Sequence, residues 1–366
     1  MPFSDFLGNP ETVHRLREMM ARQRLPHAVI LSGSRGAGKY TLALMLARAL
    51  NCLEQPITGG LPDFCGRCSN CLRIAEAADF EARFSEAVEA RDGMREADKK
   101  DTRILLQTHP DVLVIPPDPP QMMIKVDQVR RVIANIYFRP TEARERVYVF
   151  TDSAFMREAA NSLLKVLEEP PEFATIFLLT ENPGELLPTI RSRSANFALG
   201  ALPADAIEAA LRERRAEWNP RERALVARLS EGSMGRALSF DLKGYVAARS
   251  QALVLLNSSL RGNDHSELFK MTESFRPGAE GREKIEALLA TLYSLLEDLT
   301  FLHCGTPQLV RNTDIQGELG RMAQTADLAW IQRAVRGLDE VESGMRRNLL
   351  RSLSLDSLSV ALEAAV

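Results

Sequence analysis

Four of the five cysteines in this 366-residue chain are close enough in sequence to bind one metal ion. They are Cys52, Cys65, Cys68 and Cys71, in the pattern C-x12-C-x2-C-x2-C. Four thiolates can close a tetrahedral Zn²⁺ site, and a two-residue gap lets neighbouring cysteines share one ion. Because protein would fill all four positions, the predicted zinc is structural rather than catalytic. Unlinked thiols and an iron–sulfur cluster remain the alternatives.

A second group of residues has the spacing of a phosphate-binding loop. Gly33, Gly36, Gly38 and Lys39 lie in the segment GSRGAGK, which follows an apolar run and opens a helical stretch. Glycines let backbone N–H groups approach phosphate oxygens, the helix N-terminus favours negative charge, and the lysine reaches the terminal phosphates. The segment predicts a P-loop with room for ATP or ADP. Whether a nucleotide is bound is left open.

Two positions that a hydrolysing P-loop protein needs are changed. The residue after the lysine should be Ser or Thr, whose hydroxyl binds Mg²⁺, but it is Tyr40. Thr41 comes next, about 100° further around the helix, and is no direct substitute. Asp152 ends an apolar run as a metal-holding Asp would, yet Ser153 stands where P-loop ATPases with an added helical lid carry the Glu that polarises the attacking water. We therefore predict an intact phosphate cradle without efficient hydrolysis.

The elements that position these residues alternate between apolar runs and amphipathic stretches up to about residue 197. Continuous apolar runs predict strands buried on both faces of a parallel sheet, and these are 28–31, 112–115, 147–150 and 175–179. Residues 127–137 have apolar side chains three and four apart, which predicts a helix. The charged segment 73–107 interrupts the pattern. We expect it to be an inserted helical hairpin on the surface, without a strand and without an assigned function.

Strand signals stop after Leu202. Residues 204–242 predict three short helices, separated at Asn219-Pro220 and Gly232-Ser233, and longer helices such as 284–301 and 328–345 follow. We expect three parts: an α/β P-loop domain (1–202) with the zinc module (52–71) and the insertion (73–107), a small helical lid (203–242), and an all-α C-terminal domain (243–366). Cys304, alone in an apolar helical stretch, is predicted to be a buried core residue.

Composition excludes several classes of protein. The net charge of −3 is too small to attract the whole chain to nucleic acid or to a membrane. The N-terminus has no basic region followed by an apolar run, and no stretch approaches 18 apolar residues. We therefore expect a cytoplasmic protein with no membrane partner, whose cysteines are reduced or bound to metal.

Taken together, these motifs resemble those of the clamp-loader subunits of bacterial DNA polymerase III, which belong to the AAA+ superfamily. The resemblance covers most of residues 1–240, whereas the C-terminal part is similar to the family's helical collar only in length and helicity. The matching segments are LPHA (25–28), the P-loop, the four-cysteine module, HPD (109–111), ANSLLK (160–165), LEEPP (167–171) and SRS (192–194).

Within that family, Tyr40 and Ser153 match the delta-prime type, a stator, rather than the ATP-hydrolysing gamma/tau motors. A third departure is Gly235, which stands where motors carry a lid arginine that contacts the nucleotide; here Arg236 is displaced by one position. The resemblance implies a subunit of a pentameric ring with gamma/tau and delta subunits, which loads the sliding clamp onto primed DNA. Contacts with DNA would go to phosphates and be shared among subunits.

The same resemblance implies a role in trans for Arg193. Its guanidinium would reach ATP on a neighbouring gamma-type subunit and stabilise charge on the transferred phosphoryl group, as an arginine finger does. The family motif usually ends in Cys, and Ser194 departs from it. In the plainer alternative, Arg191 and Arg193 are solvated residues at the end of a short helix.

Two other functions fit the sequence less well. A gamma/tau-type ATPase would need Thr41 or water to replace the lost metal ligand, and Tyr40 and Ser153 speak against it. A P-loop kinase of small molecules would have no use for the four cysteines.

Overall fold

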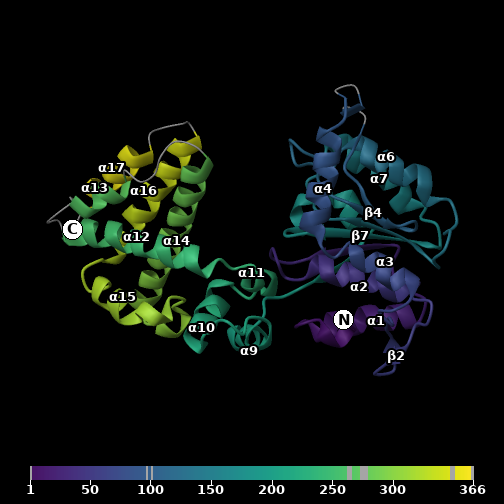
Figure 1. The fold of residues 1–366 in the computed structure, drawn as a ribbon, viewed down its shortest axis with the longest axis horizontal. Helices are drawn as coiled ribbons and strands as arrows, with labels where there is room; N and C mark the ends of the chain where they lie inside the picture. The colour runs from purple at the N-terminus through teal and green to yellow at the C-terminus, as the bar shows by residue number, and fades with distance from the viewer. Residues whose placement is uncertain are drawn as a thin grey trace. The chain divides into compact units, whose positions relative to one another are not determined.

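The computed structural model describes residues 2–95, 98–99, 102–261, 266–272, 279–346 and 351–363. The chain forms two compact units, whose elements are labelled in Figure 1. The first comprises Met1–Leu202 and Gly232–Arg236, and the second comprises Pro203–Glu231 and Ala237–Val366. Most of the predicted lid therefore groups with the C-terminal helices, while its segment Gly232–Arg236 belongs to the first unit. The division into three parts stays a prediction.

The first unit is an α/β structure. Its elements are η1 (Phe3–Asp5), α1 (Pro10–Ala21), β1 (Ala28–Ser32), α2 (Lys39–Asn51), β2 (Ile57–Thr58), β3 (Leu61–Pro62), α3 (Ser69–Glu76), α4 (Phe80–Asp92), β4 (Leu106–His109), β5 (Val112–Ile115), α6 (Val126–Ile136), β6 (Arg146–Phe150), α7 (Arg157–Glu168), β7 (Ala174–Thr180), η2 (Pro183–Glu185), α8 (Pro188–Arg191) and β8 (Ala195–Ala198).

In the described part of the chain, six strands form one sheet in the order β4-β5-β6-β7-β1-β8. All neighbouring pairs are parallel except β4 and β5, which are antiparallel. The four predicted strands correspond to β1, β5, β6 and β7, which occupy the middle of the sheet. Because parallel strands point the same way, the residues that follow β1, β6 and β7 meet at the carboxyl edge of the sheet, where these strands end. This edge positions the P-loop.

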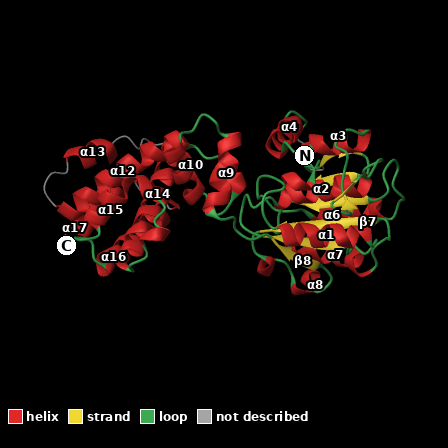
Figure 2. Cartoon of the chain, turned by 90° about the horizontal axis from the view of Figure 1, so that it is seen from below, coloured by secondary structure: helices red, strands yellow, loops and turns green. Residues whose placement is uncertain are grey.

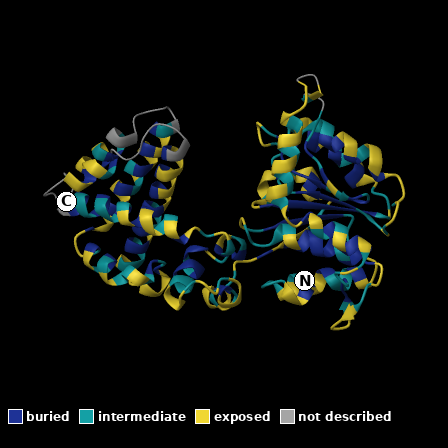
Figure 3. Ribbon diagram, in the orientation of Figure 1, coloured by how far each residue is buried: buried dark blue, intermediate teal, exposed yellow. Residues whose placement is uncertain are grey.

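Helices cover both faces of the sheet, as Figures 1 and 2 show. Successive residues of β1 alternate between faces, so Val29 and Leu31 pack with α1, α2 and α3, whereas Ala28 and Ile30 pack with α6 and α7. Strands β1, β5, β6 and β7 are accordingly mostly dark blue in Figure 3, where buried residues have that colour. The prediction of strands buried on both faces is confirmed.

The segment 73–107 differs from the prediction of a hairpin without a strand. It contains the second half of α3 and all of α4, but β4 begins at Leu106 and pairs antiparallel with β5 at the edge of the sheet. The prediction missed β4 because an edge strand with one polar face has no continuous apolar run. Residues 96–97 and 100–101 lie outside the described part.

The second unit is helical. Its elements are α9 (Ala204–Arg214), α10 (Pro220–Leu229), α11 (Met234–Leu238, whose first residues belong to the first unit), α12 (Leu242–Arg261), α13 (Ser266–Thr272), α14 (Ala279–His303), η3 (Pro307–Leu309), η4 (Thr313–Ile315), α15 (Gln316–Met322), α16 (Leu328–Arg346) and α17 (Arg351–Glu363).

The core of the second unit lies among α12, α14, α16 and α17, where Trp330 is fully buried. Helix α10 is fastened to this unit by Arg228, which donates to the carbonyls of Gln308 and Val310 at 2.9 and 3.1 Å. The three short helices and the longer C-terminal helices were predicted. Among the described residues, no helix combines the length and the apolarity that a membrane crossing requires.

The prediction that Cys304 is a buried core residue is wrong, because the structure exposes it. Cys304 directly follows the last residue of α14, where the chain turns away through Gly305 at φ +69°. The apolar face of α14 ends before it, since a helix buries only the residues on its packed side.

Candidate functional site

The P-loop connects β1 to α2 at the carboxyl edge of the sheet. Lys39 is the first residue of α2, and its ammonium donates to the carbonyl oxygens of Gly33 and Ser34 at 2.6 and 2.9 Å. Burial lowers the pKa of Lys39, while the carboxylates of Glu181 and Asp152 act in the opposite direction. Lys39 is therefore held on the carbonyls of its own loop, with two acidic residues nearby.

The segment Gly232–Arg236 lies directly on the P-loop. Gly235 N donates to Gly36 O at 2.9 Å, and Ser233 Oγ donates to Arg35 O at 2.8 Å. The approach requires glycine on both sides: a Cβ on Gly235 would lie 2.8 Å from Gly36 Cα, and a Cβ on Gly36 would lie 2.9 Å from Arg236 N. This chain therefore covers part of its own phosphate loop with a neighbouring backbone segment.

The N-terminal segment contacts both the P-loop and the cysteine module. The ring of Phe6 lies 3.0 Å from where a Cβ of Gly38 would stand, at the N-terminus of α2. Three residues earlier, Phe3 N donates to Asp63 Oδ1 at 3.3 Å, and the Phe3 ring packs edge-on against Phe64. One short N-terminal segment thus contacts both the P-loop and the cysteine module.

Tyr40 points away from the P-loop. Its hydroxyl donates to Ala77 O, just after α3, at 2.6 Å, and its ring packs edge-on against Phe80 at the start of α4, with 5.3 Å between ring centroids. Burial raises the pKa of the Tyr40 phenol, so it stays protonated and keeps donating. The side chain that stands at the Mg²⁺-ligand position instead supports the inserted helices. Thr41 is exposed on the next position of α2.

The residues after β6 are also engaged within the chain. Asp152 Oδ1 accepts from Ala154 N at 2.8 Å. Ser153 is buried, donates to the Glu185 carboxylate and accepts from Thr180 Oγ1 at 3.0 Å. A serine hydroxyl in this network cannot take a proton from water as a carboxylate does.

The four predicted cysteine ligands come together. Their sulfur atoms all lie within 4.8 Å of one another, and none is in a disulfide. Cys52 follows α2, Cys65 follows the β2–β3 hairpin, Cys68 caps α3 and Cys71 lies in its first turn. Backbone N–H groups of Gln55 and Cys65 approach Cys52 Sγ at 3.2 Å each. A four-thiolate set in this arrangement fits a structural zinc ion.

The pKa values of the thiols differ across the cluster. Burial raises the pKa of the thiols of Cys71 and Cys65. Burial also acts to raise the pKa of Cys68, but the backbone N–H groups of Cys71 and Leu53 outweigh it and leave that pKa at about 7. A cation would supply the charge that holds the remaining thiols as thiolates.

Buried polar contacts connect the cysteine module to the core. Asn70, in the first turn of α3, donates to Asn51 O at 3.0 Å, and Asn51 Nδ2 donates to Glu145 O at 3.1 Å. The guanidinium of Arg144 donates to Cys52 O. Since these contacts link α2, α3 and the segment before β6, the geometry of the cluster depends on the α/β core.

Arg193 lies at the amino ends of the parallel strands, whereas the P-loop lies at their carboxyl ends. It precedes β8, which pairs in parallel with β1 from Val29 onward, whereas the P-loop follows Ser32. The two sites are thus separated by roughly the length of β1, about 15 Å. Arg193 Nη2 forms an ion pair with Glu168 Oε1 at 2.8 Å, and Nη1 donates to Thr189 O at 3.0 Å. Arg193 is exposed and forms this ion pair at the surface.

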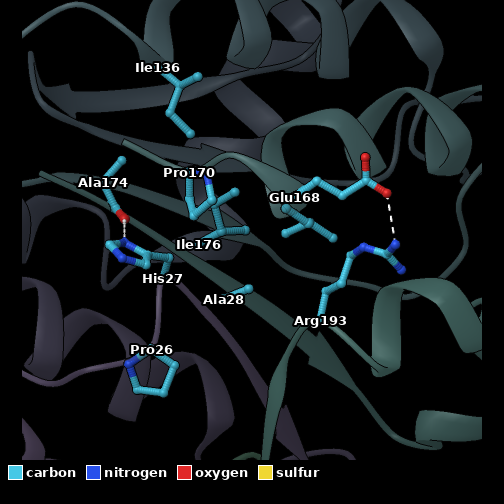
Figure 4. A pocket seen from close by; sticks show the side chains of 10 residues that line it. Pro26, His27, Ala28, Ile136, Glu168, Pro170, Ala174, Ile176 and Arg193 are labelled. Carbon is cyan, nitrogen blue, oxygen red and sulfur yellow. Dashed lines mark hydrogen bonds and ion pairs between the residues drawn. The ribbon is translucent and has the colours of Figure 1, made fainter. Parts of the chain in front are cut away.

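Figure 4 shows Arg193 and Glu168 on one side of a pocket of about 340 Å³. Ala28, Ile136 and Ile176 contribute apolar side chains to it. His27 lies on the other side, with Nδ1 3.2 Å from Ala174 O. The pocket combines one cation, one carboxylate and an apolar lining at the amino edge of the sheet.

Sequence reasoning did not anticipate three participants in these sites. Phe6 and Ser233 are far from the P-loop in sequence, and no periodicity links them to it. Glu168 belongs to the LEEPP segment, which marked a resemblance but assigned no contact. Of these contacts, only the one at Gly235 had a usable signal in the sequence, because a glycine lets another backbone segment approach closely.

Comparison with known proteins places the chain in a family. Residues 8–203 match the family described as DNA polymerase III, delta subunit. The chain belongs to this family. It is 29% identical over 322 residues to DNA polymerase III subunit tau of Escherichia coli, covering 82% of this chain and 44% of that protein. It is 26% identical over 297 residues to subunit delta' of Bacillus subtilis, covering 81% and 78%.

The chain spans about half the length of the tau relatives, 44% in Escherichia coli and 54% in Salmonella typhimurium. Among solved structures, a DNA polymerase III gamma subunit-related protein of Thermotoga maritima is similar with a TM-score of 0.42 and 18% identity, covering 96% of this chain and 99% of that one.

Proposed function

We propose that this chain is a clamp-loader subunit of DNA polymerase III, of the non-hydrolysing delta-prime type. It would act in a ring with gamma/tau-type and delta subunits that loads the sliding clamp onto primed DNA. Family membership supports the general role. The observation that carries the delta-prime role is the direction of Tyr40. Tyr40 stands at the Mg²⁺-ligand position after Lys39 in place of Ser or Thr, and its hydroxyl is bonded to Ala77 O and so is unavailable to a metal ion.

The rest of the P-loop edge supports the same proposal. Ser153 takes the place of a catalytic carboxylate and is bonded to Glu185. The segment Gly232–Arg236 lies on Gly36, and Lys39 is bonded to carbonyls of its own loop. A nucleotide in this loop would be a structural ligand, held by the loop N–H groups and Lys39, and these residues supply no base for hydrolysis.

The second part of the proposal gives Arg193 its role in trans. Arg193 and the P-loop lie at opposite edges of one sheet, so Arg193 cannot serve a nucleotide on its own chain. On a ring neighbour, its guanidinium would stabilise charge on the transferred phosphoryl group, an effect of about 10³–10⁵ in rate for arginine fingers. The four cysteines would hold a structural zinc ion that fastens α3 beside α2.

The test measures ATP binding and steady-state hydrolysis by the purified chain with Mg²⁺, alone and with primed DNA. Absence of turnover, with or without bound nucleotide, is expected. The assembled complex with a tau/gamma-type subunit then tests Arg193→Ala, which should lower the partner's hydrolysis by at least about 100-fold while leaving assembly intact. Unchanged hydrolysis with Arg193→Ala would remove the role in trans.

A gamma/tau-type motor is the second candidate, because tau and gamma subunits are prominent among the similar proteins. Turnover by the isolated chain that Lys39→Ala abolishes would establish this function. It would also require that Thr41 or water replace the lost ligand, so Thr41→Ala would then reduce turnover as well.

A further inference from the structure

Glu168 is the one acidic residue that the described structure pairs with Arg193. The two oppositely charged groups lie 2.8 Å apart at the rim of the pocket in Figure 4, and their side chains are 51% and 35% exposed. An ion pair this exposed is weak, because water screens both charges. It places the guanidinium beside Glu168 and is weak enough to be exchanged.

Glu168 does not stabilise its own helix. Glu168 is the last residue of α7. The C-terminus of a helix carries partial negative charge, so a carboxylate there is unfavourable. Lys165, in the same last turn, has the sign that this position favours. The favourable partner of Glu168 lies elsewhere in the fold, at Arg193.

The guanidinium of Arg193 is directed toward its own chain at both terminal nitrogens. Nη2 is bonded to Glu168, while Nη1 is bonded to Thr189 O at 3.0 Å and approaches Ser192 Oγ at 3.4 Å. A phosphate oxygen that takes the place of Glu168 would meet a guanidinium already fixed at Nη1. Loss of the carboxylate contact is then the main electrostatic cost of the exchange.

We propose that Glu168 is a competing carboxylate that holds Arg193 until the terminal phosphate of a nucleotide on a neighbouring subunit displaces it, so that Glu168 sets how strongly a triphosphate-loaded neighbour is engaged. This inference rests on the proposed role of Arg193 in trans. When a neighbour covers the pocket, water leaves its rim and charges interact more strongly. A carboxylate and a phosphate on the same guanidinium would then repel each other, which requires that Glu168 be released.

The exchange of Glu168 for a phosphate on Arg193 occurs only when the neighbour holds a triphosphate. A triphosphate must compete with Glu168 for Arg193. With a diphosphate, the terminal phosphate is absent and Arg193 stays paired with Glu168, so the carboxylate has no effect. Glu168→Gln removes the charge but keeps an oxygen that accepts from Arg193. It should raise affinity for the triphosphate-loaded neighbour about two- to fivefold, the equivalent of an exposed ion pair.

The experiment measures binding of this full chain to a purified tau/gamma-type subunit loaded with a non-hydrolysable ATP analogue or with ADP. Glu169→Gln is the matched control, because Glu169 is the next residue, is exposed, and has no ion pair to Arg193 in the described structure. Expected results are tighter binding of Glu168→Gln in the ATP-analogue state, unchanged binding in the ADP state, and no effect of Glu169→Gln in either state.

Two results would overturn the inference. Equal behaviour of Glu168→Gln and Glu169→Gln would show that the carboxylate does not compete, and weaker binding of Glu168→Gln would show that it assists Arg193 instead. Arg193→Ala separates this from the proposed function. If Arg193→Ala leaves ATP-state binding and the partner's hydrolysis unchanged, the role in trans itself fails. If Arg193→Ala impairs them and Glu168→Gln matches its control, only the inference about Glu168 fails.

Discussion

Tyr40 and Ser153 stand at the two positions where the sequence predicts that groups needed for hydrolysis are lost, and both side chains have structural contacts here. The Tyr40 hydroxyl is bonded to Ala77 O and its ring packs on Phe80, while Ser153 is bonded to Glu185. A hydroxyl bonded elsewhere is unavailable to a metal ion. Reversing one substitution would therefore remove a structural contact without assembling the rest of a hydrolytic site.

Tyr40→Phe should lower the free energy of unfolding of the first unit by about 1 kcal/mol, because it removes one hydrogen bond and keeps the ring. Tyr40→Ala should cost about 3 kcal/mol or more, because the packing on Phe80 is lost as well. Denaturation followed by circular dichroism is the measurement. Tyr137→Phe is the control, since Tyr137 is 48% exposed and should change stability by less than about 0.5 kcal/mol. Equal effects of Tyr40→Phe and Tyr137→Phe would contradict the role of the Ala77 contact.

At the scale of elements, the middle of the sheet could be predicted and its edges could not. Strands β1, β5, β6 and β7 are covered on both faces, so their sequences are continuous apolar runs. Strands β4 and β8 are the edge strands, and their sequences LQTH and ANFA include polar residues. A short strand with one polar face cannot be distinguished from a loop by its pattern.

The candidate sites divide in the same way. The P-loop and the cysteine cluster are local in sequence, so spacing alone could identify them. The contacts of Phe6 with Gly38 and of Glu168 with Arg193 join segments about 30 and 25 residues apart through tertiary folding, and no local periodicity records them. Gly235 on Gly36 spans nearly 200 residues, which only the fold brings together.

The contact between α11 and the P-loop can be tested by Gly235→Ala. In a helix, alanine is favoured over glycine by about 1 kcal/mol, but here the added Cβ would lie 2.8 Å from Gly36 Cα, so the segment must shift. We expect faster hydrogen exchange at residues 33–40 and 232–238, measured by mass spectrometry. Gly320→Ala, in α15 with open space around the new Cβ, should leave exchange there unchanged. Unchanged protection in Gly235→Ala would show that the contact does not constrain the loop.

At the scale of the whole molecule, the two units have separate hydrophobic cores. The clusters on the two faces of the sheet belong to the first unit, and the cluster around Trp330 belongs to the second. Both tryptophans of the chain, Trp218 and Trp330, are in the second unit, whereas the four clustered cysteines are in the first. Tryptophan fluorescence therefore reports the second unit and leaves the first silent, which separates their stabilities experimentally.

Removal of zinc should act on the first unit alone. We expect one zinc ion per chain by elemental analysis, and its loss in Cys68→Ser, because three thiolates leave the site open. Since zinc binding to small four-ligand sites contributes about 10–16 kcal/mol in peptides, loss of the ion should shift the first unit's unfolding by several kcal/mol. Circular dichroism should show this shift, while the fluorescence transition stays in place. Cys304→Ser is the control, because Cys304 is exposed and outside the cluster. Unfolding curves that match the control, or a fluorescence transition that moves with the dichroism, would contradict a structural metal confined to the first unit.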